Sequence, residues 1–410
     1  MMDILNLVAK AEDELRYIFK EIDNVCYINS RRVLKAFNDN GVSEVHFNMT
    51  TGYGYGDIGR DIVDAVFASV LGGEDALVRN QFISGTHALT VTLFGLLRPF
   101  DRLIYISGRP YDTLDSVIGL VENASSLKSY GVLYDDIDLV DNDFDYDKIR
   151  KYLNENSVKV VAIQKSKGYS TRASLSDEKL KHVIKMVKEI DKDIIIMVDN
   201  CYCELVTTSS PLKVGADIIV GSLIKNLGGG IASNGAYVCG RADLVNLVSE
   251  RLTVPGCGKE VGPSLGANKM FLQGLFMAPS VVSSSLKVAV LTSYLMEKLG
   301  FKVEPKYSDK RVDIVQNIIF EDKDRMIKYC QGIQKNSPID SNSLCIPSYM
   351  PGYSDDVIMA SGSFTQGSSI ELSCDGPLRN PYIAYQQGSL SYEYGKIAVI
   401  EAIKNMLGEK

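Results

Sequence analysis

The sequence predicts an α/β protein with a mostly parallel central sheet, flanking helices and a smaller C-terminal α+β domain. Two mostly apolar runs, residues 194–198 and 216–220, of which the second contains Asp217, are flanked by turn-forming residues, as is typical of strands buried on both faces of a parallel sheet. Strand-like and helix-like segments alternate before these runs. The chain has 410 residues, more than one average domain holds, so two domains are expected.

The N-terminal half begins with predicted helices over residues 3–40, where apolar residues recur at helical spacing in two pieces. A loop rich in glycine and tyrosine, 48–60, leads to a helix over 61–71 that stops at two glycines. The remaining elements of this half are expected strands at 76–79, 103–106 and 158–163, a helix opening at Ser84 and a helix over 177–190.

The C-terminal half contains a predicted helix over 242–250, a glycine-rich loop over 253–262 and an amphipathic helix over 283–299. We expect the change of domain inside or just after this last helix, near residues 290–300. Beyond it lie strand candidates at 314–320 and 369–372, and helices over 325–334 and 391–407.

This pattern divides the chain into three parts. They are an N-terminal helical segment with its loop, 1–60, a large α/β domain, 61–295, and a small α+β domain, 296–410.

The composition is that of a soluble globular protein, with 45% hydrophobic and 23% charged residues. A net charge of −7 gives no reason to expect a nucleic-acid partner. No apolar run approaches the ~20 residues that span a bilayer. The N-terminus mixes acidic and apolar residues and lacks the basic start and apolar core of a signal peptide, so a cytoplasmic location is expected.

Metal binding is not expected. The eight cysteines are dispersed, and the pair Cys201 and Cys203 has no second pair nearby. With only three histidines in the chain, a structural zinc site is disfavoured, and reduced, mostly buried thiols are the expectation.

The main candidate site lies at the ends of the two apolar runs. The first run ends at Asp199, and the second leads through Ser222 to Lys225. Ligands of open α/β sheets bind outside the carboxyl ends of the strands, where both residues should meet. An acid beside a lysine is what pyridoxal phosphate chemistry requires, because the lysine forms a Schiff base and the acid keeps the pyridine nitrogen protonated.

A phosphate site is predicted where a helix opens at Ser84-Gly85-Thr86-His87. Free N–H groups and the positive end of the helix dipole favour an anion there. Gly85 allows close approach of the backbone, Thr86 adds a hydroxyl group, and the hydroxyl of Ser222 could reach the same phosphate. Tyr111, in a loop after a strand, is a candidate to stack on the pyridine ring.

Two further segments have competing interpretations. Gly54-x-Gly56-x-x-Gly59 matches the dinucleotide fingerprint, but the residues before it are too polar and short for a convincing strand, so nicotinamide binding is disfavoured. Arg379 is either a surface arginine or a bidentate clamp for a substrate carboxylate.

Five segments together resemble fold type I pyridoxal-phosphate enzymes of the cystathionine β-lyase and methionine γ-lyase class. Within this class, the sequence is most similar to the bacterial branch known as aluminium resistance proteins or methionine γ-lyase family proteins. The segments are TGYGYGDIGRD (51–61), SGTHAL (84–89), VDNCYCEL (198–205), SLIKNLGGGIA (222–232) and SIELSCDGPLR (369–379).

The resemblance implies a role for each candidate residue. Lys225 would carry the cofactor, Asp199 would pair with its ring nitrogen, and Tyr111 would stack on the ring, with His87 as the alternative. By the same resemblance, Ser222, Gly85 and Thr86 would hold the phosphate, Tyr55 and Arg60 would be lent to it by a neighbouring subunit, and Arg379 would hold the substrate carboxylate.

The resemblance also implies a role in amino acid metabolism. It further implies a homo-oligomer, which would be a dimer at least and is expected to be a tetramer. Lys225 would remove the α-proton of a sulfur-containing amino acid, and Tyr111 could assist by proton transfer. A thiolate would leave from the β or γ carbon, and a 2-oxo acid and ammonia would follow. The alternatives are an aminotransferase or aldolase-type enzyme, a nicotinamide-dependent oxidoreductase, and a non-catalytic binding protein that kept the fold.

The sequence departs from the better-studied lyases at three places. Ile224 stands where they have a threonine before the lysine, and Tyr55 and Arg60 are further apart than the corresponding pair. The acidic and proline-containing loop before the aspartate is replaced by residues 164–169. The resemblance therefore implies the fold and the cofactor and leaves the substrate open.

Overall fold

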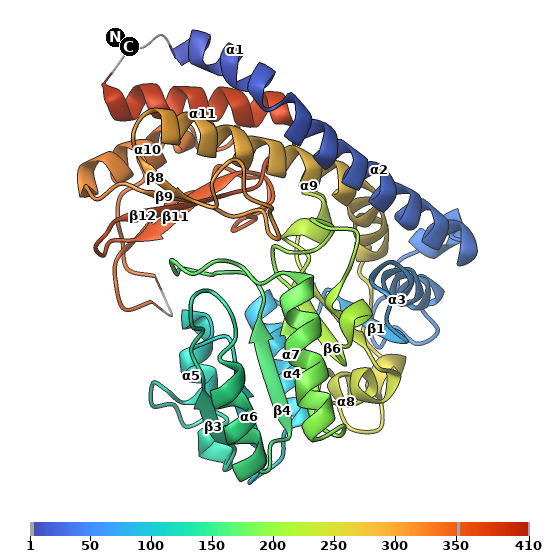
Figure 1. The fold of residues 1–410 in the computed structure, drawn as a ribbon. Coiled ribbons are helices and arrows are strands. Elements are labelled where there is room, and N and C mark those ends of the chain that lie inside the picture. The colour runs from blue at the N-terminus through green and yellow to red at the C-terminus, as the bar shows by residue number, and fades with distance from the viewer. Residues whose placement is uncertain (1–3, 351–352, 409–410) are drawn as a thin grey trace.

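The computed structural model describes residues 4–350 and 353–408 and contains two β-sheets (Figure 1). The larger sheet has seven strands in the order β1-β7-β6-β5-β4-β2-β3. β7 is antiparallel to both neighbours and all other pairs are parallel, which confirms the predicted mostly parallel sheet. The strands are β1 (Asp75–Arg79), β2 (Arg102–Tyr105), β3 (Leu133–Asp136), β4 (Val160–Gln164), β5 (Ile195–Asp199), β6 (Ile218–Ser222) and β7 (Ala236–Gly240).

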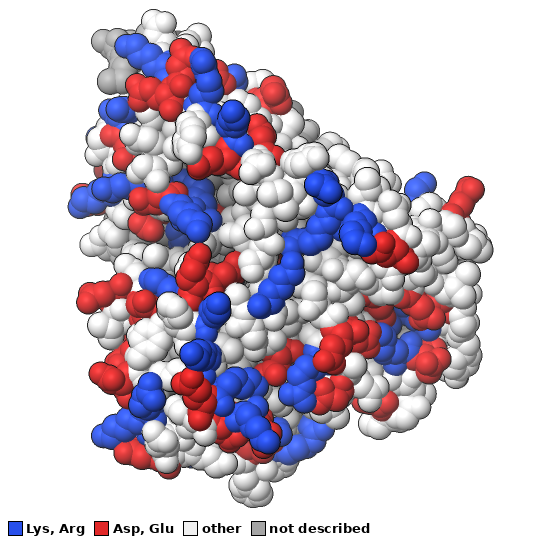
Figure 2. Space-filling view, turned by 45° about the vertical axis from the view of Figure 1, so that its right-hand side comes forward, with Lys and Arg blue, Asp and Glu red and all other residues white. Residues whose placement is uncertain are grey.

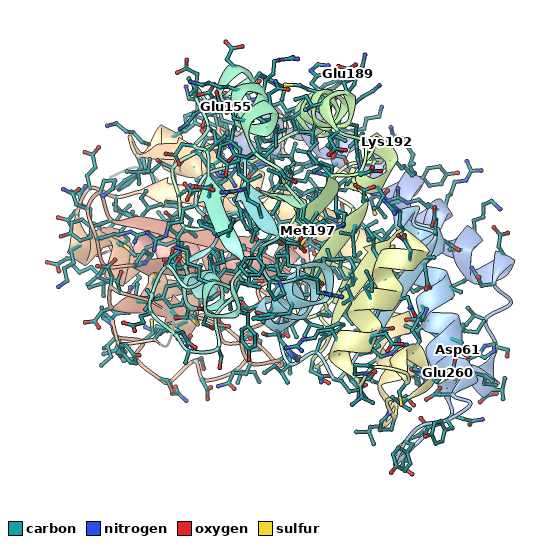
Figure 3. The ribbon with its side chains drawn as sticks, turned by 90° about the horizontal axis from the view of Figure 1, so that it is seen from below. Asp61, Glu155, Glu189, Lys192, Met197 and Glu260 are labelled. Carbon is teal, nitrogen blue, oxygen red and sulfur yellow. The ribbon has the colours of Figure 1, made fainter. Side chains whose placement is uncertain are left out.

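Helices cover both faces of this sheet. Successive side chains of each strand point to opposite faces, so the apolar strands present an apolar surface on each face. Ile196 and Val198 of β5 join one apolar core, whereas Ile195 and Met197 join the other. Figure 3 shows Met197 near the middle of the layers. One core contains α3 (Ile58–Leu71), α6 (Tyr146–Glu155) and α7 (Asp177–Ile190), and the other contains α4 (Gly85–Leu96) and α8 (Ala242–Leu252).

The smaller sheet is antiparallel, with strand order β10-β11-β12-β9-β8. Its core also takes in the N-terminal helix α1 (Ile4–Glu14), so the two ends of the described chain pack on the same layer. The elements are β8 (Lys302–Glu304), β9 (Gln316–Ile319), β10 (Val357–Ala360), β11 (Ser373–Pro377), β12 (Ile383–Gln387), α10 (Lys323–Lys335) and α11 (Tyr392–Leu407).

The long helix α9 (Ala267–Lys298) joins the two layers, and the prediction that it begins at residue 283 was wrong. The exposed face of its first half carries the apolar Phe276 and Met277 beside polar residues, and Pro279 stands within it, so no clear polar stripe marks this half in the sequence. By length and composition α9 could cross a membrane. However, 72% of its most apolar window is buried inside the protein, as in a core helix.

Two other predictions were also corrected. The strand expected at 369–372 is a turn, because Leu372 has a φ of 112°, and the strand begins one residue later as β11. The N-terminal helices divide at Leu15, between α1 and α2 (Arg16–Asp39). Over the face shown in Figure 2, basic and acidic side chains are interspersed.

Candidate active site

Three neighbouring strand ends bring the predicted lysine and acid together. Gln164 at the end of β4 pairs in register with Asp199 at the end of β5, which pairs with Val220 of β6. β6 ends at Ser222, and Lys225 follows in the turn. Asp199, Ser222 and Lys225 all line one cavity of about 240 Å³ at this edge of the sheet.

Lys225 is held over an aromatic ring. Its Nζ lies 3.9 Å from the ring centre of Tyr202. Tyr202 has a φ of 69° in the turn that follows β5. Burial by itself would lower the pKa of the Lys225 amine, but Cys201, Tyr202 and Asp199 raise that pKa above its ordinary value. The free amine is therefore a cation that the surrounding groups stabilise.

Asp199 is buried and fixed at the floor of the cavity. Its Oδ1 accepts a hydrogen bond of 3.0 Å from the backbone N–H of Cys201, and its backbone oxygen accepts one from the N–H of Lys165. The turn after β5 therefore orients the carboxylate toward the cavity that it lines.

A cradle for an anion lines the same cavity. Ser84 caps α4 by accepting a hydrogen bond from the N–H of His87, so the N–H groups of Gly85 and Thr86 have no partner within the helix. The hydroxyl of Ser222 is buried and lacks a hydrogen-bond partner in the described structure. A Cβ on Gly85 would lie 3.1 Å from the Ser222 Cβ and would narrow the cradle.

Tyr111 lines the same cavity but also belongs to a cluster of tyrosines. Its hydroxyl bonds that of Tyr353 at 2.5 Å, and its ring centre lies 5.5 Å from that of Tyr169. Burial raises the pKa of Tyr111 well above its ordinary value. The Tyr111 hydroxyl is therefore neutral at physiological pH, and it can donate a proton only through a hydrogen bond.

Several cavity residues were missed by the sequence analysis. Asp375 of β11 is buried and lines the cavity from the small sheet. Burial raises the pKa of Asp375 to about 7, while hydrogen bonds from Tyr169 and Gln387 and the charge of Lys225 act in the opposite direction. Tyr169 and Tyr202 follow predicted strand ends, which could have marked them, whereas the place of Asp375 depends on how the two sheets meet.

Two predicted residues lie outside this cavity. The Nδ1 of His87 accepts a hydrogen bond from the N–H of Ile83, and its ring contacts Phe82. Arg379 is half-exposed in a neighbouring cleft, where it contacts Asp355 at 3.3 Å and the backbone oxygen of Tyr169. Tyr169 lines both the cleft and the cavity, so it separates Arg379 from Lys225.

Tyr55 and Arg60, expected to reach a neighbouring subunit, have different environments. Tyr55 is 67% exposed and stacks on Tyr53. Arg60 is only 3% exposed, and its guanidinium donates to the backbone oxygens of Gly54 and Gly262 in its own chain. Tyr55 is therefore free to meet a partner, whereas the Arg60 side chain is occupied where it stands.

Packing explains two of the three glycines of the dinucleotide-like pattern, and the third, Gly56, has a positive φ of 66°. A Cβ on Gly54 would lie 2.7 Å from the backbone of Pro263, and a Cβ on Gly59 would lie 2.1 Å from the backbone oxygen of His46. The segment before them is a short 3₁₀ helix, Glu44–Phe47, and a loop, so the strand that a nucleotide site requires does not precede them. Within the described ranges, no group of three or more His, Cys, Asp or Glu residues could hold a metal ion.

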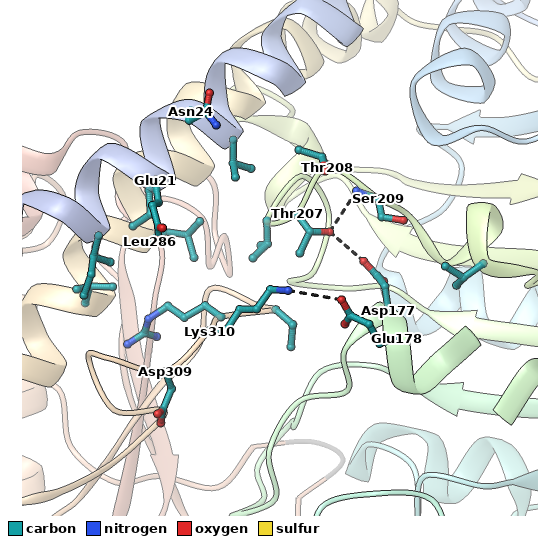
Figure 4. A pocket seen from close by; sticks show the side chains of 18 of the residues that line it. Glu21, Asn24, Asp177, Glu178, Thr207, Thr208, Ser209, Leu286, Asp309 and Lys310 are labelled. Atoms are coloured by element: carbon teal, nitrogen blue, oxygen red, sulfur yellow. Dashed lines mark hydrogen bonds and ion pairs between the residues drawn. The ribbon is translucent and has the colours of Figure 1, made fainter. Parts of the chain in front are cut away.

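A larger pocket, of about 580 Å³, lies elsewhere, between α2, the start of α7 and the segment 309–312 (Figure 4). Lys310 lies 3.5 Å from Glu178, and the Thr207 hydroxyl bonds Asp177 at 3.0 Å. None of the predicted site residues lines it. Size therefore does not identify the active site of this protein, and the chemistry of the lining favours the smaller cavity.

Comparison with known proteins identifies the family of this chain. The family profile described as methionine gamma-lyase matches residues 4–407. The YnbB protein of Bacillus subtilis is 48% identical over 97% of this chain and 95% of its own length. A carbon–sulfur lyase of Clostridium novyi, described as involved in aluminium resistance, is 48% identical with a TM-score of 0.94, covering 98% of this chain and 96% of its own.

A protein of Listeria monocytogenes, named as a candidate cystathionine β-lyase involved in aluminium resistance, is 44% identical with a TM-score of 0.96, covering 98% of this chain and 100% of its own. The pyridoxal-phosphate-dependent YhfS protein of Escherichia coli, at 16% identity and a TM-score of 0.62, covers 93% of this chain and 96% of its own and shares the fold. The fold is thus that of fold type I pyridoxal-phosphate enzymes, and the chain belongs to the methionine γ-lyase family.

Proposed function

We propose that this protein is a pyridoxal-phosphate-dependent carbon–sulfur lyase, which eliminates a thiol from the β or γ carbon of a sulfur-containing amino acid. A 2-oxo acid and ammonia would be the other products. The observation that carries the proposal is the single cavity shared by Lys225, Asp199 and the cradle at Gly85 and Ser222.

The residues present fit this cofactor. The unpartnered hydroxyl of Ser222 and the open N–H groups of Gly85 and Thr86 would hold the phosphate. Asp199, fixed by the Cys201 N–H, would keep the ring nitrogen protonated. When bound, pyridoxal phosphate supplies the electron sink that allows an amino acid to lose its α-proton.

Lys225 would hold the cofactor and, once the substrate has displaced it, would remove the α-proton with Nζ. Its place over the Tyr202 ring keeps Nζ inside the cavity throughout. Tyr111 would position a proton for the leaving sulfur, since its neutral hydroxyl lines the same space. Arg379 would hold the substrate carboxylate only if Tyr169 moves aside.

A homo-oligomer is part of the proposal. Large apolar side chains are exposed on loops that are joined by hydrogen bonds, such as that from the N–H of Gly262 to the oxygen of Tyr53. One of them, Ile83, directly precedes the phosphate cradle and is 80% exposed. A second copy of the chain would cover this face and bring Tyr55 to the neighbouring cavity. The exposed loop residues are Met49, Tyr53, Tyr55, Ile83, Val254 and Leu265, and Phe276 is exposed on α9.

The test begins with the absorbance of the purified protein. Wild type is expected to be yellow, and borohydride should bleach it and fix the cofactor on Lys225. Lys225→Ala should lose this link and all turnover, whereas Lys181→Ala, which removes an exposed lysine, should keep both. Release of thiol, pyruvate and 2-oxobutanoate from a panel of sulfur amino acids would then identify the bond that is broken; full activity of Lys225→Ala would refute the proposal.

A further inference from the structure

Charge in the cavity is unevenly distributed. The charged side chains that line it are Asp199, Lys225 and Asp375. With the cofactor in place, Asp199 faces the ring nitrogen and Lys225 is occupied by the cofactor. Asp375 then remains without a counterion, because no lysine or arginine in the described ranges forms an ion pair with it.

Asp375 is held so that it faces the cavity. Its Oδ1 accepts a hydrogen bond of 3.1 Å from the Gln387 amide, and the two residues sit on paired strands β11 and β12. An isolated carboxylate in a buried site is costly unless a cation joins it. The burial that raises the pKa of Asp375 is the sign of this cost, and a positively charged ligand would remove it.

The walls beside Asp375 are aromatic. Tyr169 lies 5.6 Å from Tyr353 and 5.5 Å from Tyr111 between ring centres, and all three line the cavity with Asp375. The faces of aromatic rings attract cations, as the position of Lys225 on Tyr202 already shows in this cavity. Rings together with one carboxylate form a chemical surface suited to a cationic group and poorly suited to a second carboxylate.

We infer that the substrate is an amino acid whose side chain ends in a positively charged group, which binds between Asp375 and the rings of Tyr169, Tyr111 and Tyr353. This inference rests on the proposed function, because it assigns the substrate class of the same cavity. Asp375 lies at the end of the cavity that the small sheet forms. It is then the residue that determines specificity for the charged end of the substrate side chain.

Binding can be tested without any reaction. L-Ornithine and L-norleucine have side chains of the same size, and they differ in a terminal ammonium against a methyl group. We expect the holoprotein, titrated at a pH above 7 and followed by cofactor absorbance, to bind ornithine about tenfold more tightly than norleucine. Equal affinity for the two in wild type would overturn the inference whatever any variant does.

Variants then identify the residue. Asp375→Asn should lose the preference for ornithine and keep its affinity for norleucine. Asp356→Asn removes one negative charge from an exposed position directly before β10 of the small sheet and should keep the preference. A preference that survives in a folded Asp375→Asn protein, judged by its circular dichroism, would refute the role of Asp375.

The rate of thiol release distinguishes a failure of this inference from a failure of the proposed function. S-(2-Aminoethyl)-L-cysteine and S-propyl-L-cysteine differ in the same way as the first pair, and both can release a thiol. Faster thiol release from the aminoethyl compound, lost in Asp375→Asn, would support both ideas. If no sulfur amino acid released a thiol but the preference for ornithine remained, the lyase proposal would be refuted and the inferred binding of a cationic side chain would stand. Equal rates of thiol release from the two compounds would support the lyase proposal and refute the inferred preference for a cationic side chain.

Discussion

The amine of Lys225 lies 3.9 Å from the ring centre of Tyr202, a residue whose backbone adopts the left-handed conformation with φ at 69°. A residue other than glycine in this conformation costs about 1–2 kcal/mol. The cost is offset by the surrounding turn, whose Tyr202 oxygen accepts a hydrogen bond from the N–H of Ile314. The turn thus holds an aromatic face under the lysine that would carry the cofactor.

Removing this face should speed loading of the cofactor. Tyr202→Leu removes the cation–π contact that stabilises the ammonium form of Lys225, so more of the amine is neutral and able to attack the cofactor aldehyde. We therefore expect pyridoxal phosphate to attach to Lys225 about 3–10 times faster in apo protein. Tyr202→Phe keeps the ring and should load at close to the wild-type rate. The measurement is the growth of cofactor absorbance after mixing; equal rates for Leu and Phe variants would show that the ring has no such role.

Adding a methyl group at Gly85 should weaken the phosphate cradle. The new Cβ would lie 3.1 Å from the Ser222 Cβ, where the phosphate is proposed to bind. Gly85→Ala should therefore raise the dissociation constant for pyridoxal phosphate at least about tenfold. The apo variant should melt close to the wild-type temperature, since the greater helix preference of alanine opposes the tight contact with the Ser222 Cβ. A tight cofactor complex with this variant would place the phosphate elsewhere.

The sequence was sufficient to locate Asp199 and Lys225, because continuous apolar runs imply buried parallel strands and such strands place their carboxyl ends at one edge. The same logic located Gly85 and Ser222. Local sequence patterns predict the position of a residue only where local structure determines it, as at the end of a strand or the start of a helix.

Asp375 and Arg60 show where local patterns fail. Asp375 reaches the cavity because two sheets meet there, and Arg60 is buried because a loop some 200 residues later folds over it. Neither relation leaves a mark in the sequence nearby. The first half of α9 was missed for a different reason, since its exposed face carries the apolar residues Phe276 and Met277 and so gives no clear polar period.

Arg60 should matter for the fold of its own subunit. Its guanidinium donates to the backbone oxygens of Gly54, Gly262 and Glu260, and these bonds connect two loops. Arg60→Met leaves these buried acceptors unpaired, so the free energy of unfolding in urea should fall by about 1–3 kcal/mol. Lys35→Met, which removes an exposed surface charge, is the control and should change little.

Measuring both the stability of the apo protein and the affinity for the cofactor in Arg60→Met distinguishes a role in folding from a role in cofactor binding. If Arg60 were lent to the phosphate of a neighbouring subunit, Arg60→Met would raise the dissociation constant for pyridoxal phosphate while leaving the stability of the apo protein unchanged. We expect the opposite pattern. Tyr55→Ala, at an exposed position, should leave the stability of the apo subunit unchanged and weaken the cofactor complex if the partner contact exists.

Asp375 should make the stability of the apo protein depend on pH. Burial raises its pKa to about 7 from 3.8, so the folded state binds this proton more tightly than the unfolded state. Its contribution to stability is therefore complete below the unfolded pKa and is lost as the pH rises through 7. Asp375→Asn is neutral at every pH and cannot lose this contribution. The difference in free energy of unfolding, variant minus wild type, should rise by about 1–3 kcal/mol between about pH 5 and about pH 8.

Urea unfolding at the two pH values measures this difference directly. Glu204, whose pKa burial also raises to about 7, is present in both proteins, so its effect cancels in the comparison. Asp356→Asn provides the baseline, because it removes a carboxylate at an exposed position. If Asp375→Asn also gave a constant difference, Asp375 would be ionised in the folded protein throughout this range, and a cation inside the cavity would have to accompany it even before a substrate binds.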